Sequence, residues 1–268
     1  MAQQPTPLPE PDWSPLASCL AVIPSGMRVS LAARHLGTGS TLDYDPDRPV
    51  QAASTIKTLI LAALARAVDA GTLDLDMDVA VRADMRAGGS GVLNWLHEGI
   101  SLPLRDHAWL MIAISDNTAS NAVIDTVGLS IVQQTTIELG VPSLRLGRRF
   151  YGYVPKDEIS RNEATARGLA DLLTSIWNDT AASPERCRWM RRLHGDQQHR
   201  DRLPRCLPDG ISYAGKTGTL DGISHDMGVI EGPSGAVAVA ALIESSAGHY
   251  DDEVYLGRIG EAIGEIVS

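Results

Sequence analysis

The chain has 268 residues, 44% of them hydrophobic, which is enough to bury a core as one large domain or as two interleaved ones. Its net charge of -10 argues against a nucleic-acid or anionic-membrane surface, because both require clustered positive charge. The three cysteines have neither metal-ligand spacing nor an even count, so we expect free thiols, no metal site and no cofactor.

The N-terminal part of the sequence carries no sign of targeting. No apolar run of about 18 residues occurs in the chain, so no membrane span is expected. The N-terminus lacks the basic and apolar regions of a secretory signal, which favours a cytoplasmic protein for the sequence as it stands. Removal of a signal peptide would instead make the protein periplasmic or secreted. Residues 1–15 are rich in proline and are predicted to form a tail.

Secondary structure is predicted to change from sheet to helix and back along the chain. A short helix over 16–23 is expected before a strand over 28–36, a Gly-rich turn and a strand over 41–44. Apolar spacing and Gly stops then predict helices over 54–70, 104–114, 119–127, 130–139 and 166–177. The arginine-rich segment 186–205 is interpreted as a solvated helix face and loop. The remainder predicts strands over 211–219, 225–231 and 236–245 and a last helix over 250–267.

Strands at both ends with helices between them predict an α/β (α+β) fold, in which an antiparallel sheet flanked by helices is built from both termini. Residues 16–48 together with 208–268 would form this α/β domain. Residues 49–207 would form an inserted all-α domain, with the functional site at the junction. A monomer is the default expectation.

The pentapeptide Ala-Ser-Thr-Ile-Lys at 53–57 begins the first long helix. Ser54 and Lys57 are three residues apart and therefore neighbours on one helical face. Lysine is scarce in this chain, since it occurs only at 57, 156 and 216. Arginine stays charged in proteins, whereas a buried lysine can lose its proton and act as a base. A serine nucleophile with a lysine base is therefore a reasonable hypothesis.

Three short motifs follow one another in the order Ser54-Thr-Ile-Lys57, Ser115-Asp-Asn117 and Lys216-Thr-Gly218. Each motif alone is common, but the three in this order are specific. On these motifs the chain resembles the serine hydrolase superfamily of class A β-lactamases and penicillin-binding proteins, from residue 28 to residue 268. The resemblance implies the fold of that superfamily and an acyl-enzyme mechanism.

The resemblance also implies roles for the residues around the nucleophile. Ser54 would attack an amide carbonyl after Lys57 takes its proton, and burial together with the charge of Lys216 would keep Lys57 neutral. Ser115 would pass a proton to the leaving nitrogen. Asn117 would hold the side-chain amide of the substrate.

The third motif implies a site for a substrate carboxylate. Lys216 and the hydroxyls of Thr217 and Thr219 would bind that carboxylate, while Gly218 would let the substrate approach the strand closely. The backbone N–H groups of Ser54 and Thr219 would form the oxyanion hole. The expected ligand is thus a small β-lactam, or a related amide or ester that carries a carboxylate.

The chain departs from the class A pattern at the residue that breaks the acyl-enzyme. That family places a Glu, which activates water, on the loop before the helix found here at 166–177. Aligning residues 162–165 with the end of the loop puts Arg149 or Phe150 at the Glu position. Asp157 or Glu158 could substitute only from a differently folded loop. Acylation could then proceed while deacylation stalls.

The leading interpretation is a serine hydrolase that acts on an amide, with a β-lactam as the expected substrate. One alternative is a D,D-peptidase or esterase of the penicillin-binding type, acylated by β-lactams without fast turnover. Another is a substrate-binding module without catalysis. His225 is a further candidate for substrate contact or general base chemistry, against the alternative of a packed, hydrogen-bonded strand residue.

Residues 210–217 match the P-loop pattern of nucleotide triphosphatases. A P-loop must open a helix, whereas the residues that follow here predict a turn. We therefore reject the P-loop interpretation.

Overall fold

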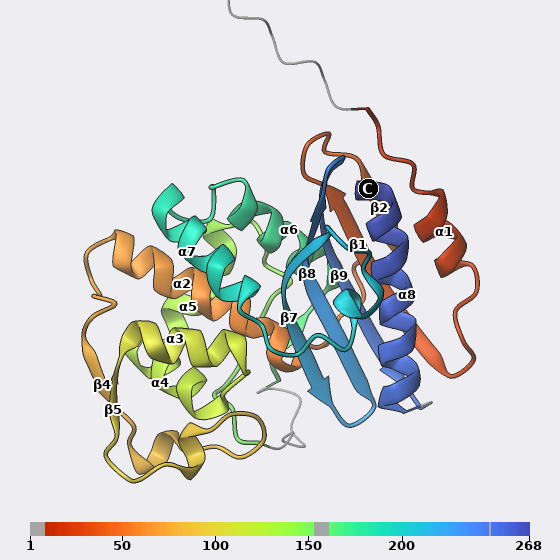
Figure 1. The fold of residues 1–268 in the computed structure, drawn as a ribbon. Coiled ribbons are helices and arrows are strands. Elements are labelled where there is room, and N and C mark those ends of the chain that lie inside the picture. The colour runs from red at the N-terminus through yellow and green to blue at the C-terminus, as the bar shows by residue number, and fades with distance from the viewer. Residues whose placement is uncertain (1–8, 153–160, 247) are drawn as a thin grey trace, which may run out of the picture.

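The computed structural model describes residues 9–152, 161–246 and 248–268 and shows an α+β architecture (Figure 1). One antiparallel sheet of five strands has the spatial order β2-β1-β9-β8-β7. Both ends of the chain contribute to it, which confirms the expected fold class. The strand bounds are β1 (Met27–His35), β2 (Thr41–Tyr44), β7 (Ser212–Leu220), β8 (Ile223–Gly232) and β9 (Gly235–Ser245).

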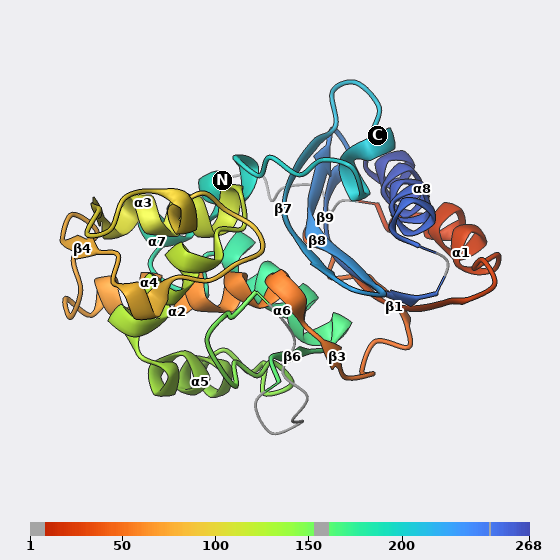
Figure 2. The same cartoon turned by 90° about the horizontal axis from the view of Figure 1, so that it is seen from below.

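The two faces of the sheet are covered by different helices (Figure 2). The C-terminal helix α8 (His249–Val267) and the short α1 (Ser14–Leu20) lie on one face. The remaining helices, with α6 (Ala166–Trp177) nearest the sheet, lie on the other. Side chains alternate accordingly, because Leu31 belongs to the core under α8 and Ala32 to the core of the helical layer.

Helix α2 (Lys57–Asp69) is the centre of the helical layer. Residues 57–65 are all buried, as expected for a helix that is apolar almost all round. Its neighbours in this layer are α3 (Leu104–Ala113), α4 (Asn117–Val127), α5 (Leu129–Glu138) and α7 (Pro184–Gly195). The helix that carries the candidate lysine is therefore the most enclosed element of this layer.

Local sequence signals explain where these helices begin and end. The Asp116 carboxylate accepts a hydrogen bond from the N–H of Ala119 at 2.8 Å and so caps α4. Thr165 caps α6 in the same way through the N–H of Gly168 at 3.0 Å. Gly128, with a φ of 93°, separates α4 from α5.

Two small strand pairs were not predicted from the sequence. β3 (Val50–Gln51) pairs with β6 (Glu163–Ala164), and β4 (Asp78–Ala80) pairs with β5 (Ser101–Pro103). The first pair ties the chain just before Ser54 to the end of the loop in which the deacylating Glu was sought.

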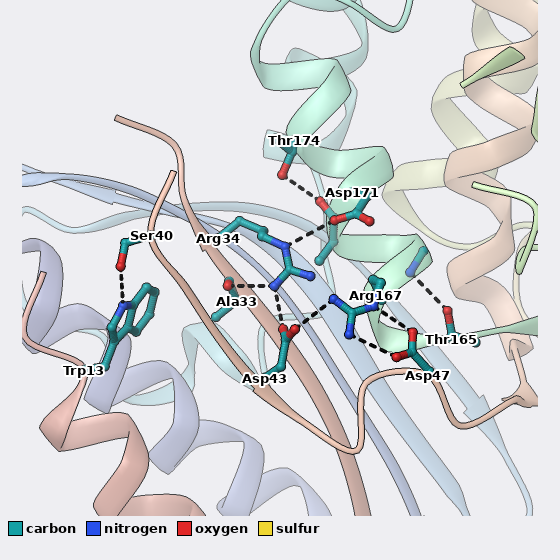
Figure 3. Close-up of polar contacts among 12 residues, drawn as sticks. Trp13, Ala33, Arg34, Ser40, Asp43, Asp47, Thr165, Arg167, Asp171 and Thr174 are labelled. Atoms are coloured by element: carbon teal, nitrogen blue, oxygen red, sulfur yellow. Dashed lines mark hydrogen bonds and ion pairs between the residues drawn. The ribbon is translucent and has the colours of Figure 1, made fainter. Parts of the chain in front are cut away.

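The predicted tail, 1–15, differs from the structure at its end. Helix α1 begins at Ser14, and the Trp13 indole N–H donates to the Ser40 hydroxyl at 3.0 Å (Figure 3). Residues 13–15 therefore pack on the β1–β2 turn. The boundaries of the two predicted domains stay a prediction. Within the described ranges, no helix combines the length and the apolar character needed to cross a bilayer.

A network of charged side chains ties the β1–β2 hairpin to α6 (Figure 3). Arg34 bonds Asp43 at 2.5 Å and Asp171 at 3.2 Å. Arg167 bonds Asp43 at 2.9 Å and Asp47 at 2.7 Å. We call these five residues the hairpin network.

Candidate active site

Ser54 lies on a 3₁₀ turn, η1 (Ala53–Ile56), immediately before α2. The α-helix starts at Lys57, three residues later than the sequence predicted. Ala53 has a φ of 47°, a left-handed conformation that non-glycine residues adopt only when the surroundings impose it. The Thr55 hydroxyl, which donates to the Ala52 carbonyl at 2.6 Å, helps to hold this turn.

Strand β7 packs directly against the Ser54 turn. A Cβ added to Gly218 would lie 3.1 Å from the Ala53 Cβ and 3.1 Å from the Thr55 methyl. Gly218 is thus required for the close approach of β7 to η1, in addition to any role toward a ligand. Thr217 and Thr219 flank it on the same strand, and no helix follows, which agrees with rejecting a P-loop.

Lys57 is fully buried below the site. Its ammonium donates to the Ser115 carbonyl at 2.7 Å, to the Ser115 hydroxyl at 3.1 Å and to Asn117 Oδ1 at 2.8 Å. Burial first, and then the charge of Lys216, hold the pKa of Lys57 well below its usual value, against the opposing effect of Asp116. Burial and the neighbouring charge therefore favour loss of a proton from this nitrogen.

Among the described residues, no hydrogen bond joins Ser54 to Lys57, since the ammonium donates to Ser115 and Asn117 instead. Three protons on the nitrogen are matched by three acceptors. Loss of one proton would leave a lone pair free to accept from a hydroxyl. Hydrogen bonds of catalytic groups are often loose without substrate and tighten on binding.

Asp116 holds in place the loop at residues 90–93, which forms one wall of the site. Its carboxylate accepts from the N–H groups of Val92 at 2.6 Å and Leu93 at 2.9 Å, besides capping α4. The N–H of Asn117 donates to the Ser90 carbonyl at 3.1 Å. These contacts place Ser90 beside Ser54, and they occupy Asp116 with backbone groups.

Lys216 is also fully buried, and its ammonium donates to the Thr217 carbonyl at 2.8 Å. Burial lowers the pKa of Lys216 to about 7, helped by Arg202 and opposed by Asp226. The charge of Lys216 in turn disfavours the charged form of Lys57.

Arg202 is a site residue that sequence reasoning missed, because the segment 186–205 was interpreted as solvated. Its guanidinium donates to the carbonyls of Gly218 at 2.9 Å and His225 at 2.7 Å and to the Thr219 hydroxyl at 2.6 Å. The side chain is buried, with its Nε lacking a partner in the described structure. Nothing in the local sequence separates Arg202 from the exposed arginines beside it.

A buried carboxylate holds the Arg202 segment in place. Asp226 accepts from the Tyr213 hydroxyl at 2.5 Å and from the Leu203 N–H at 3.0 Å. Burial raises the pKa of Asp226 to about 6, while the Tyr213 bond and Arg202 oppose that rise. Asp226 therefore anchors the residue next to Arg202.

Two cavities meet at Ser54. The larger, of about 140 Å³, is lined by Ser54, Asn117, Arg148, Phe150, Tyr151 and Asn162, among others. The smaller, of about 70 Å³, is lined by Ser54, Ser90, Ser115, His199, Asp201, Arg202, Thr217 and Thr219. Ser54, Ser90 and Thr219 line both. A ligand carbonyl at Ser54 would have one substituent directed into each cavity.

Phe150 occupies the wall near Lys57. Its ring centroid lies 4.4 Å from the Lys57 nitrogen. Its backbone is fixed by Asn121, which accepts from the Phe150 N–H at 2.8 Å and donates to its carbonyl at 2.8 Å. Arg149 instead pairs with Asp125 at 2.6 Å, away from the cavity. Of the two residues aligned with the Glu position, Phe150 is the one that reaches the site.

The other sequence candidates are less directly placed. His225 is buried, with Nδ1 accepting from the Ile243 N–H at 3.1 Å and Nε2 lying 3.0 Å from the Gln51 carbonyl. Burial lowers the pKa of His225 to about 4, so the ring is neutral and both nitrogens are occupied by backbone groups. This geometry favours the packed alternative. Asp157 and Glu158 lie outside the described residues.

The chain is similar in sequence to known proteins. A model of a family described as "Beta-lactamase enzyme family" matches residues 19–267. A beta-lactamase regulatory protein, BlaB, of Streptomyces cacaoi is 28% identical over 82% of this chain and 85% of its own length. A beta-lactamase of Bacillus licheniformis is 26% identical over 85% of this chain and 75% of its own.

Solved structures show the same fold. A beta-lactamase from Sphaerobacter thermophilus superposes with a TM-score of 0.89 at 36% identity, covering 94% of this chain and 96% of that one. The structure of PBP-A superposes with a TM-score of 0.86 at 25% identity, covering 96% of this chain and 98% of that one.

Proposed function

Because the chain belongs to the beta-lactamase enzyme family, whose model spans residues 19–267, we propose that it is a serine hydrolase in which Ser54 forms an acyl-enzyme. Its ligands are β-lactams and acyclic amides or esters that carry a carboxylate. Lys57 is the base that takes the Ser54 proton. Its burial and its lowered pKa support this role, and a positioned base contributes about 10²- to 10⁴-fold in rate.

Ser115 relays the proton from Lys57 to the leaving group. It is hydrogen-bonded to Lys57 at 3.1 Å and also lines the smaller cavity, so it contacts both partners of that transfer. Its φ of 58° is a strained conformation that such a position would justify. Asn117 holds the Lys57 amine and borders the larger cavity, where the acyl group is bound.

The leaving side of the substrate carries the carboxylate, which Lys216, Thr217 and Thr219 bind together with Arg202. The N–H groups of Ser54 and Thr219 stabilise the oxyanion. Both residues line the two cavities at their junction, which supports this assignment.

The main support for slow deacylation is the position of Phe150, whose ring centroid lies 4.4 Å from the Lys57 nitrogen. An aromatic ring there cannot activate water, and the described lining of the larger cavity contains no carboxylate. We therefore place the chain with the penicillin-binding type, in which a β-lactam acylates the serine and leaves slowly. One solved relative, a variant of PBP-A with a TM-score of 0.87 and 25% identity, is an acyl-enzyme complex with penicillin G.

Incubation with a fluorescent penicillin and with a chromogenic cephalosporin tests this function. We expect one covalent label per chain and little colour beyond the first turnover. Ser54→Ala should abolish the label, whereas the control Ser90→Ala, at a serine lining the same cavities, should keep it. Steady colour release would instead establish a β-lactamase with turnover, and labelling of Ser54→Ala would overturn the nucleophile.

A binding module without catalysis is the second candidate, favoured by the name of the Streptomyces cacaoi relative, a regulatory protein. Such a module would bind the penicillin reversibly. Equal affinity of the wild type and Ser54→Ala in calorimetry, with no mass adduct on either, would support it against the acyl-enzyme proposal.

A further inference from the structure

The smaller cavity contains a titratable group that none of the assigned roles uses. His199 lines it together with Ser54, Ser115 and Arg202. The cavity measures about 70 Å³. One water needs only about 10–15 Å³ of such volume, so a small acyl acceptor fits beside Ser54.

Backbone contacts hold the His199 segment against the end of α3. The Gln198 N–H donates to the Ala113 carbonyl at 2.9 Å. The Gln197 side chain donates to the Ile112 carbonyl at 2.9 Å and accepts from the His199 N–H at 3.0 Å. The segment is thereby fixed just before Ser115, and the histidine is placed by the fold although it is exposed to solvent.

The main chain also lies beside the imidazole. The backbone of Ile114, the residue before Ser115, raises the pKa of the ring. A neutral imidazole keeps one ring nitrogen as an acceptor. A base beside a nucleophile is the arrangement that acyl transfer requires.

The charges around the ring favour its neutral form. Although His199 is exposed as a residue, partial burial of its ring lowers its pKa below its usual value, and the charges of Lys216 and Arg202 lower it further, while Asp201 opposes them. A neutral imidazole is able to take a proton at pH 7. On the other side of Ser54, Phe150 leaves no such group in the described lining of the larger cavity.

We propose that His199 is the base of deacylation, acting on an acyl acceptor that enters the smaller cavity once the leaving group has left it. This inference rests on the proposed function. The unprotonated nitrogen of the His199 ring takes a proton from water while the water oxygen attacks the carbonyl carbon of the Ser54 ester. The bond from that carbon to Ser54 Oγ then breaks, and the proton passes to Oγ, giving a carboxylic acid and free serine.

Water reaches the acyl carbon from this side only after the smaller cavity has been cleared. An acyclic ester or thioester loses its leaving group and clears the cavity, whereas the leaving nitrogen of a β-lactam stays attached through the opened ring. An acyclic substrate whose leaving group carries a carboxylate is therefore the probe that reports on His199.

The test uses the full chain with an acyl-thioglycolate thioester, whose thiol product is measured with a disulfide reagent. We expect a burst of thiol followed by turnover. His199→Gln should keep the burst and lower the steady rate about 10²-fold. His97→Gln, at an exposed loop histidine whose carbonyl accepts from Arg86, is the matched control and should keep both.

The pH profile separates catalysis from a structural effect. The steady rate of the wild type should fall as the pH drops through a value below 6.5, where His199 becomes protonated, and His199→Gln should lose this dependence. The rate of labelling by fluorescent penicillin, which reports folding and acylation, should change less than about twofold.

The outcomes distinguish the two proposals. An unchanged steady rate in His199→Gln with normal labelling overturns the role of His199 and leaves the acyl-enzyme intact. A burst without any turnover in the wild type overturns it as well. Neither burst nor labelling in the wild type overturns the acyl-enzyme proposal itself.

Discussion

The hairpin network and the Ser54 cleft are both rich in charge, but they treat it in opposite ways. In the hairpin network each arginine, Arg34 and Arg167, faces two carboxylates. Several of these groups are substantially open to solvent. Exposed ion pairs of this kind contribute about 0–1 kcal/mol each to stability. The hairpin network therefore attaches the hairpin to α6 without burying charge, and it lies apart from the groups proposed for proton transfer.

In the cleft, three buried basic side chains, Lys57, Lys216 and Arg202, lie in one region with the carboxylates of Asp116 and Asp226. Asp116 is occupied by backbone N–H groups and Asp226 by Tyr213 and Leu203. Burying charge without full pairing is costly, and the pKa values move in consequence. Charged groups are therefore buried, at a cost in stability, where proton transfer is needed, and they form solvated pairs where they only attach one element to another.

Removing the central amine of the cleft should give the largest effect. Lys57→Met should slow acylation by fluorescent penicillin by about 10²- to 10⁴-fold, because the Ser54 hydroxyl loses its base. Stopped-flow labelling measures the rate. Arg167→Met, which removes a cation of the hairpin network, should leave it unchanged. Full acylation in Lys57→Met would rule out its role as the base.

The two regions should also differ when a carboxylate is removed. Asp226→Ala removes the acceptor of the buried Leu203 N–H and of the Tyr213 hydroxyl, and with it the negative charge near Lys216 and Arg202, so the free energy of unfolding should fall by about 3–5 kcal/mol. Asp171→Ala in the hairpin network should lower it by less than about 1 kcal/mol. Urea denaturation followed by circular dichroism measures both. Equal losses would contradict the contrast between the regions.

A carboxylate can also be added to the Ser54 cleft, so that Lys57 faces an acid as the arginines of the hairpin network do. Phe150→Glu would place an acid beside Lys57 and Ser54, able to activate water, and should speed the loss of penicillin from the acyl-enzyme by about 10²-fold. Decay of the adduct by mass spectrometry is the measurement. Phe150→Gln introduces a side chain of the same size as Glu but without the acid, so it should not speed the loss of penicillin. If it does, the removal of the Phe150 ring and not base chemistry is responsible.

The most gradual effect is a pH dependence of stability. The folded pKa of Lys216 is about 7, below its usual 10.5, so between these values the unfolded chain binds more protons. The free energy of unfolding should therefore rise with pH over this window, by up to about 1.4 kcal/mol per pH unit from this group. Lys216→Met should make the rise shallower without abolishing it, because burial also lowers the pKa of Lys57. Denaturation curves at several pH values decide this, and an unchanged slope in the variant would contradict it.

Much of the fold was predictable because its signals are local. Helix α6 was predicted over 166–177, with the observed bounds, since its apolar spacing and the Thr165 cap are read within a few residues. The strand pairs β3–β6 and β4–β5 were missed because a strand of two or three residues is too short to show an alternation of polar and apolar residues. Such a strand forms only when the fold brings its distant partner beside it.

The candidate site divides in the same way. The three motifs, and with them the candidates Ser54, Lys57, Ser115 and Lys216, were recognisable in the sequence because their residue types and order are specific. The fold turned Arg202 inward and placed Phe150, not Arg149, against Lys57. It also locked His225 between Gln51 and Ile243 and brought His199 to the cavity. The physical reason is that the direction and protonation of a single polar side chain depend on partners far away in the chain, which no local pattern encodes.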